Sequence, residues 1–103
     1  MLGETVAFIS VFLGGVETAN IGPYDFFGAE QMKRVIWSDI ERSYVNTHPD
    51  GFIDVDGKIY MLDDWEVKIE SCYSSVCSEI IKERVSAIKE RKAEQIKIMH
   101  NVP

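Results

Sequence analysis

One apolar run restricts the fold of this chain more than any other feature. From Val6 to Leu13 the sequence reads VAFISVFL, which is rich in β-branched and aromatic residues, and it ends at Gly14-Gly15. A short apolar run bounded by glycines is typical of a strand buried in a sheet. We therefore predict a buried strand over 6–13, followed by a loop that extends from Val16 to Gly22-Pro23.

The size and composition of the chain predict a single domain, residues 1–103. With 103 residues, of which 46% are hydrophobic, the chain is long enough for one modest core. The formal net charge is -6, from 17 acidic and 11 basic residues. This balance argues against a broad basic surface, which is how most nucleic-acid-binding proteins gain affinity. Any contact with nucleic acid must then be local.

The cysteines and the apolar runs predict a cytoplasmic protein that does not enter a membrane. Cys72 and Cys77 are the two cysteines of the chain. In a helix they would lie about 140° apart around the axis, too far round to pair, so we expect free thiols in a reducing compartment. The run between Val6 and Val16 is too short to span a bilayer, and no basic residue precedes it as a signal peptide requires.

Two segments have the periodicity of helices. The first begins at about Asp25, an acceptable N-cap, and continues to about Val45. The second begins at about Ser74 and carries apolar residues at helical spacing to the end of the chain. The predicted apolar faces are Met32, Val35, Ile36, Ile40 and Tyr44 in the first helix, and Ile81, Val85, Ile88, Ile96 and Met99 in the second.

A β-hairpin is predicted between the two helices. Phe52–Val55 and Lys58–Leu62 flank Asp56-Gly57, a strong two-residue hairpin turn. We expect the second strand to continue to Ile69, with Asp63-Asp64 as a bulge. The fold class that we predict is α/β, a small mixed β-sheet with a central β-hairpin flanked by two helices, in the order strand, helix, hairpin, helix.

Three side chains on this hairpin could carry chemistry. Glu66 and Lys68 are two residues apart on one strand, so their side chains project from the same face. Asp50, at the start of the neighbouring strand, reaches that face if the register suits. Paired carboxylates bind Mg²⁺ or Mn²⁺, which activates a bound water and stabilises charge on a phosphate. A lysine beside them orients or deprotonates the water, or neutralises the transition state.

The stretch HPDGFIDVDGKIYMLDDWEVKIE resembles the PD-(D/E)xK nuclease superfamily, which includes restriction endonucleases, Holliday-junction resolvases and small phage nucleases. Pro49-Asp50 matches the first motif of that family and Glu66-x-Lys68 matches the second. The resemblance implies metal-dependent phosphodiester hydrolysis of duplex or branched DNA, with Asp50, Glu66 and Lys68 as catalytic residues. It also implies a further acidic metal ligand from the preceding helix, Glu41 or Glu30.

A second hypothesis makes no use of Lys68. The predicted C-terminal helix, of roughly 25 residues, has more apolar surface than a small sheet needs for its own cover. Such a helix could pair with itself in a homodimer or bind a host or cognate protein. The alternative to a nuclease is therefore a small acidic interaction protein, such as an inhibitor, an immunity protein or a phage host-takeover factor.

Overall fold

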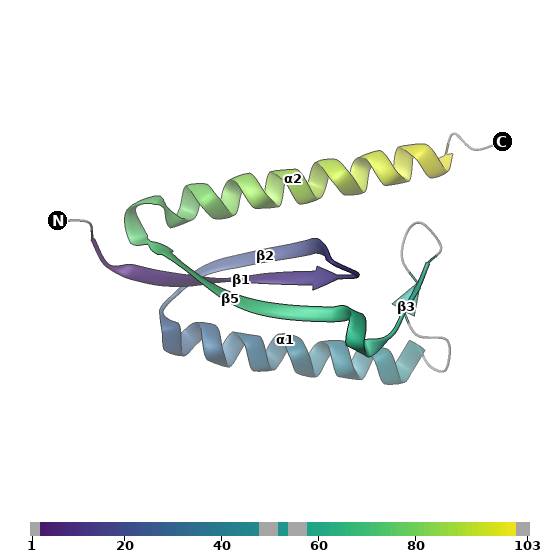
Figure 1. The fold of residues 1–103 in the computed structure, drawn as a ribbon, viewed down its shortest axis with the longest axis horizontal. Helices are drawn as coiled ribbons and strands as arrows, with labels where there is room; N and C mark the ends of the chain where they lie inside the picture. The colour runs from purple at the N-terminus through teal and green to yellow at the C-terminus, as the bar shows by residue number, and fades with distance from the viewer. Residues whose placement is uncertain (1–2, 48–51, 54–57, 101–103) are drawn as a thin grey trace.

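The computed structural model describes residues 3–47, 52–53 and 58–100 (Figure 1). It is an α/β fold with one three-stranded antiparallel sheet and two long helices. In chain order, the elements are β1 (Thr5–Leu13), β2 (Val16–Tyr24), α1 (Phe26–Thr47), β3 (Phe52–Ile53), β4 (Ile59–Tyr60), the 3-10 turn η1 (Leu62–Asp64), β5 (Trp65–Tyr73) and α2 (Ser74–His100).

β1 is the central strand of the sheet, whose order is β2-β1-β5. The predicted strand over 6–13 is thus confirmed. α1 packs against one face of the sheet and α2 against the other, so that β1 is covered on both sides (Figure 1). Because successive residues of a strand point to opposite faces, β1 supplies two separate cores.

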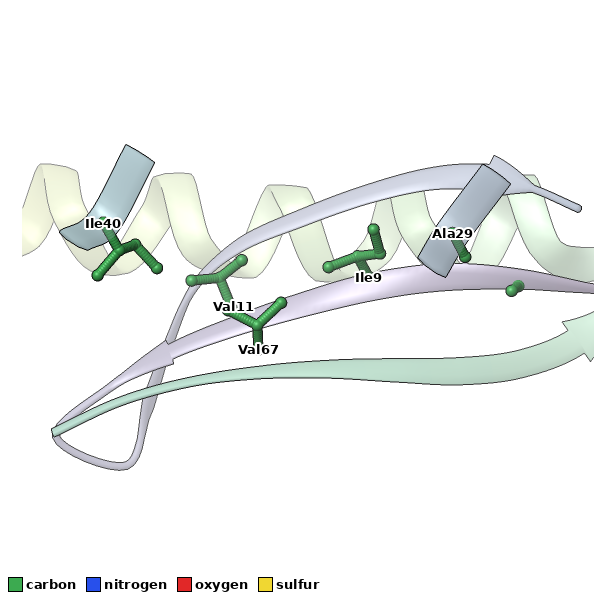
Figure 2. Packing of buried hydrophobic residues seen from close by; sticks show 6 residues of the cluster. Ile9, Val11, Ala29, Ile40 and Val67 are labelled. Atoms are coloured by element: carbon green, nitrogen blue, oxygen red, sulfur yellow. The ribbon is translucent and has the colours of Figure 1, made fainter. Parts of the chain in front are cut away.

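The core beneath α1 is built from odd-numbered strand positions. Ile9 and Val11 of β1 lie beside Val67 of β5, and Ala29 and Ile40 of α1 close over them (Figure 2). Ile9 and Ala29 are fully buried. The core beneath α2 is smaller and is built from even-numbered strand positions, with Phe8, Cys72, Cys77 and Ile81 as its buried members.

Cys72 and Cys77 form a disulfide, so the prediction of two free thiols is wrong. That prediction placed both residues in one helix. In the structure, Cys72 belongs to β5 and Cys77 to the first turn of α2, and the change of direction between them leaves their Cα atoms 5.4 Å apart. That distance lies within the range that a disulfide spans.

The segment that was predicted as a loop, Val16 to Pro23, is strand β2, so that prediction is also wrong. Gly14 and Gly15 both have positive φ, +60° and +81°, and form a tight turn that returns the chain along β1. The tertiary pairing with β1 outweighs the polar composition of the segment. The register shifts at two places along β2, which are irregular points of the ladder.

The predicted central hairpin differs from the observed topology. Phe52 pairs with Tyr60 and Ile53 with Ile59, but β3 and β4 form a two-stranded sheet of their own. The expected continuation into Ile69 is interrupted at Asp63-Asp64, which lie in a 3-10 turn and not in a bulge. β5 then pairs with β1, and the three-stranded sheet is antiparallel throughout, not mixed.

Both predicted helices are confirmed. Asp25 caps α1, since the backbone N–H of Gly28 donates to its Oδ1 at 2.6 Å. In α1, Ile40 is buried against the sheet, as predicted. Val35 is 52% exposed, so the prediction that it belongs to the apolar face of the helix is wrong. In the described part of the chain, neither helix is apolar over a length that would cross a bilayer.

A substitution at the centre of the sheet tests the double-sided packing of β1. We expect Ile9→Ala to lower the free energy of unfolding by about 3 kcal/mol, because it leaves a cavity at a fully buried position. Ile59→Ala is the matched control, since Ile59 is 60% exposed, and it should change stability by less than about 0.5 kcal/mol. Urea unfolding measures both values; equal losses for the two variants would contradict this packing.

Candidate functional site

Glu66 and Lys68 lie together on the α2 side of β5. Lys68 Nζ and Glu66 Oε1 are 2.9 Å apart, and each side chain is more than half exposed. They share the face of the strand that also carries Glu70, which contacts α2. The alternation of the strand thus places the acid and the lysine as the sequence predicted.

The surroundings of this pair are partly aromatic and partly acidic. Lys68 Nζ lies 5.2 Å from the centre of the Phe12 ring on the neighbouring strand, a cation–π distance. A shallow hollow of about 200 Å³ adjoins the pair. Its lining comprises Phe12, Gly15, Asp63, Asp64, Trp65, Glu66 and Lys68. One carboxylate of this hollow is already engaged, because Asp64 Oδ2 accepts the N–H of Met61 at 2.8 Å.

The other predicted site residues do not join the pair within the described residues. Glu30 and Glu41 are exposed on α1, which packs against the opposite face of the sheet, where Val67 points. The sheet therefore lies between Glu41 and Glu66, and the structure does not bring these two predicted metal ligands together. Asp50 lies outside the described residues.

The donors that are described do not fit a divalent cation. Mg²⁺ and Mn²⁺ require several oxygen ligands around one point. Over residues 3–47, 52–53 and 58–100, no three acidic, histidine or cysteine side chains are grouped in a way that could hold a metal ion. The carboxylate of Glu66 is instead neutralised by the Lys68 ammonium group.

A polar network that the sequence analysis missed lies next to this pair, between the sheet and α2. Arg84 of α2 donates from Nη1 to Glu70 Oε2 at 2.6 Å and to Ser10 Oγ at 3.2 Å. Asn20 Nδ2 donates to Ser10 Oγ and to Glu17 Oε2, each at 3.0 Å. The Ser10 hydroxyl donates to Glu70 Oε2. The network joins all three strands to α2, and Ser10 at its centre is fully buried.

The network keeps Glu70 ionised. Burial alone would raise the pKa of its carboxyl, but hydrogen bonds from Ser10 and Arg84, with the charges of Arg84 and Lys68, outweigh burial and hold that pKa below its usual value. The hydrogen bond to Glu70 in turn raises the pKa of the Arg84 guanidinium. The one signal for this network in the sequence was Ser10, a polar residue inside the apolar run.

The backbone of β5 has one edge against β1 and an outer edge. The Gly14 N–H donates to the Asp64 carbonyl at 2.9 Å, and the Ser74 N–H to the Glu4 carbonyl at 2.7 Å. Both bonds join facing residues of the β1–β5 register, and both involve even-numbered residues, so the even-numbered residues of β5 form hydrogen bonds with β1. The backbone N–H and C=O groups of the odd-numbered residues therefore point to the outer edge. Among these residues are Val67, Ile69, Ser71 and Tyr73.

The two edge strands of the sheet differ in how they are protected. Arg91 Nη1 and Lys92 Nζ of α2 donate to the carbonyls of Glu17 and Thr18 in β2, at 3.0 and 3.2 Å. β2 also contains Pro23 and two register shifts. Such features keep other strands from pairing with an edge. β5 contains no proline, pairs with β1 over nine consecutive residues without a shift, and has no strand of the described chain on its outer edge.

Comparison of this chain with protein-family models, with curated proteins and with solved structures gave no match.

The ionised state of Glu70 gives a pH-dependent prediction. Because its pKa is lowered in the folded protein, Glu70 contributes stability that is fully present above its unfolded pKa and is lost as the pH falls through the folded pKa. We expect Glu70→Gln to be less stable than the wild type by about 1–2 kcal/mol at pH 7. The difference should shrink in acid, where both side chains are neutral.

Urea unfolding at pH 7 and at acidic pH measures this difference. Glu79→Gln is the control, since Glu79 is an exposed carboxylate on α2, and it should change stability by less than about 0.5 kcal/mol. An equal loss of stability for Glu70→Gln at both pH values would show that the network does not depend on the charge of Glu70.

Proposed function

We propose that this chain is a non-enzymatic interaction protein that binds its partner by strand addition at the outer edge of β5. The observation that supports this proposal is the difference between the two edges of the sheet. β2 is protected by the basic side chains of α2 and by its irregular register, whereas β5 is regular and nine residues long. An unprotected regular edge is a template for pairing with another strand.

The outward backbone groups of β5 provide the affinity in this proposal. Val67, Ile69, Ser71 and Tyr73 offer N–H and C=O groups at a spacing that an extended segment of a partner matches. In strand addition, main-chain hydrogen bonds give affinity and alternate side chains give specificity. The side chains beside this edge on the α2 face are Glu66, Lys68 and Glu70, so the partner is selected by charge.

The Cys72–Cys77 disulfide bears on the compartment in which the protein acts. The predicted cytoplasmic location depended in part on free thiols, and the Cys72–Cys77 disulfide removes that support. Disulfides persist mainly in oxidising environments. We propose that the interaction takes place in such an environment.

Metal-dependent hydrolysis of DNA is the second candidate function. One observation favours it: Glu66 and Lys68 project from the same exposed face, as the nuclease motif requires. Asp50, the remaining motif residue, lies outside the described residues. In the nuclease family, the two motif strands are adjacent in the sheet. In the described part of this chain, β3, which follows Asp50, pairs with β4 and not with β5, the strand of Glu66 and Lys68. The geometry therefore supports the interaction protein better.

Site-specific photo-cross-linking tests the interaction proposal. Ser71 is exposed and lies on the outer edge of β5, so a benzoylphenylalanine placed there should form a covalent adduct with the bound strand in cells that make the protein. The same probe at Glu83, an exposed position on α2, is the control and should give none. If position 71 gives no adduct while the variant is folded, strand addition at β5 is contradicted.

Nicking of supercoiled and branched DNA with Mg²⁺ or Mn²⁺ tests the second candidate. Because the described donors do not fit a divalent cation, we expect no cleavage above background by the wild type. Cleavage by the wild type that Glu66→Ala and Lys68→Ala both abolish, with circular dichroism spectra unchanged, would establish the nuclease function instead.

A further inference from the structure

When two β5 strands are placed antiparallel, Lys68 of each strand can face Glu70 of the other. On the α2 face, the sequence places Glu66, Lys68 and Glu70 at alternate positions, with Ile69 between Lys68 and Glu70. We propose that the strand added at β5 is the β5 strand of a second copy of this chain, paired antiparallel about a two-fold axis at Ile69. This inference rests on the proposed function and names its partner.

A two-fold axis at Ile69 determines which residues of the two β5 strands face each other. Lys68 of each copy faces Glu70 of the other, and opposite charges on directly facing positions stabilise a pair of strands. The two-fold axis generates this contact twice. The backbone alternation is compatible with this register, because the odd-numbered residues Val67, Ile69 and Ser71 point their N–H and C=O groups outward in both copies.

The backbone hydrogen bonds between the two copies follow from this alternation. Ile69 faces Ile69, and Val67 faces Ser71, as hydrogen-bonded pairs in which each residue both donates and accepts. Lys68 and Glu70 then face each other at the non-hydrogen-bonded positions, where facing side chains approach most closely.

Other registers that also pair odd-numbered residues with odd-numbered residues are disfavoured because they bring like charges together. An axis at Lys68 would set Lys68 against Lys68 and Glu66 against Glu70, and an axis at Glu70 would set Glu70 against Glu70. An axis at Val67 does pair Glu66 with Lys68. It also sets Asp64 against Glu70, and the last four residues of β5, 70–73, then face no residue of the other β5 strand. Of these four registers, the one with its axis at Ile69 is the one in which all nine residues are paired and no like charges face each other.

The ends of the paired strands are aromatic. With the axis at Ile69, Tyr73 of one copy faces Trp65 of the other, and aromatic cross-strand pairs stabilise sheets. Tyr73 is 44% exposed in the single chain, and this pairing covers it. The net charge of -6 on each copy opposes association. The register must therefore bring unlike charges together, and the axis at Ile69 does so.

Glu70 is positioned for this contact by the network beneath α2. Arg84 donates to both carboxylate oxygens of Glu70, Ser10 donates to Oε2, and the Glu70 side chain is one-third exposed. Lys68 is more than half exposed on the same face. Both groups are thus accessible at the edge where the second copy docks, while the β1 edge of the strand is already paired.

Sedimentation equilibrium over a range of concentrations tests the proposal. We expect the full-length wild type to form dimers, and Lys68→Glu to weaken dimerisation at least tenfold, because it sets two like charges against each other twice. Lys82→Glu is the control: it makes the same change of charge at an exposed position of α2 and should leave dimerisation unchanged. Ser71→Pro removes one outward N–H and should also abolish the dimer, without breaking a bond to β1.

The outcomes separate the partner from the mode of binding. Circular dichroism and thermal unfolding first establish that each variant is folded. In the dimer, the probe at position 71 should cross-link to the Val67 region of a second copy, found by mass spectrometry. A monomeric wild type, or a dimer that Lys68→Glu leaves intact, overturns this inference. An adduct at position 71 with a different protein overturns it too, but supports the proposed function; no adduct contradicts both.

Discussion

The structure depends on the burial of β1 from both sides. Its odd-numbered residues, among them Ile9, pack beneath α1, and its even-numbered residues, among them Phe8, pack beneath α2. In a chain of 103 residues, a single strand that serves two cores makes both helices necessary, because removing either one would expose apolar surface of the same strand. The two helices, the flanking strands β2 and β5, and the turn at Gly14-Gly15 are all arranged around this strand.

The two faces of the sheet differ in chemistry. The α1 face is apolar over most of its length, whereas the α2 face combines a small apolar core with the Ser10, Glu70 and Arg84 network. Removing one partner from a buried polar network leaves the other polar groups without hydrogen bonds. Such a network therefore stabilises one relative position of the elements that it joins. The network thus fixes the position of α2 over β1 and β2. As a consequence, α2 protects the edge of β2, whereas no strand in the described part of the chain lies on the outer edge of β5.

This difference between the edges connects stability with function. A small antiparallel sheet always has two edges, and an unprotected edge invites pairing with other chains. In this chain, Arg91 and Lys92 protect the edge of β2, and β5 carries alternating charges at its outer edge. In the proposed dimer, the same Lys68 that suggests a nuclease motif in the sequence selects the register by facing Glu70 of the second copy.

The sequence by itself determined the elements whose signals are local. The apolar run at 6–13 predicted β1, the Asp25 cap and helical spacing predicted α1, and the alternation of Glu66 and Lys68 placed both on one face. Long-range pairing decided the rest. β2 forms because the turn at Gly14-Gly15 returns the chain along β1, and β5 joins β1 across about fifty residues of intervening chain. Which strands pair, which cysteines meet and which edge stays open depend on contacts between residues far apart in the chain, and neither composition nor periodicity contains that information.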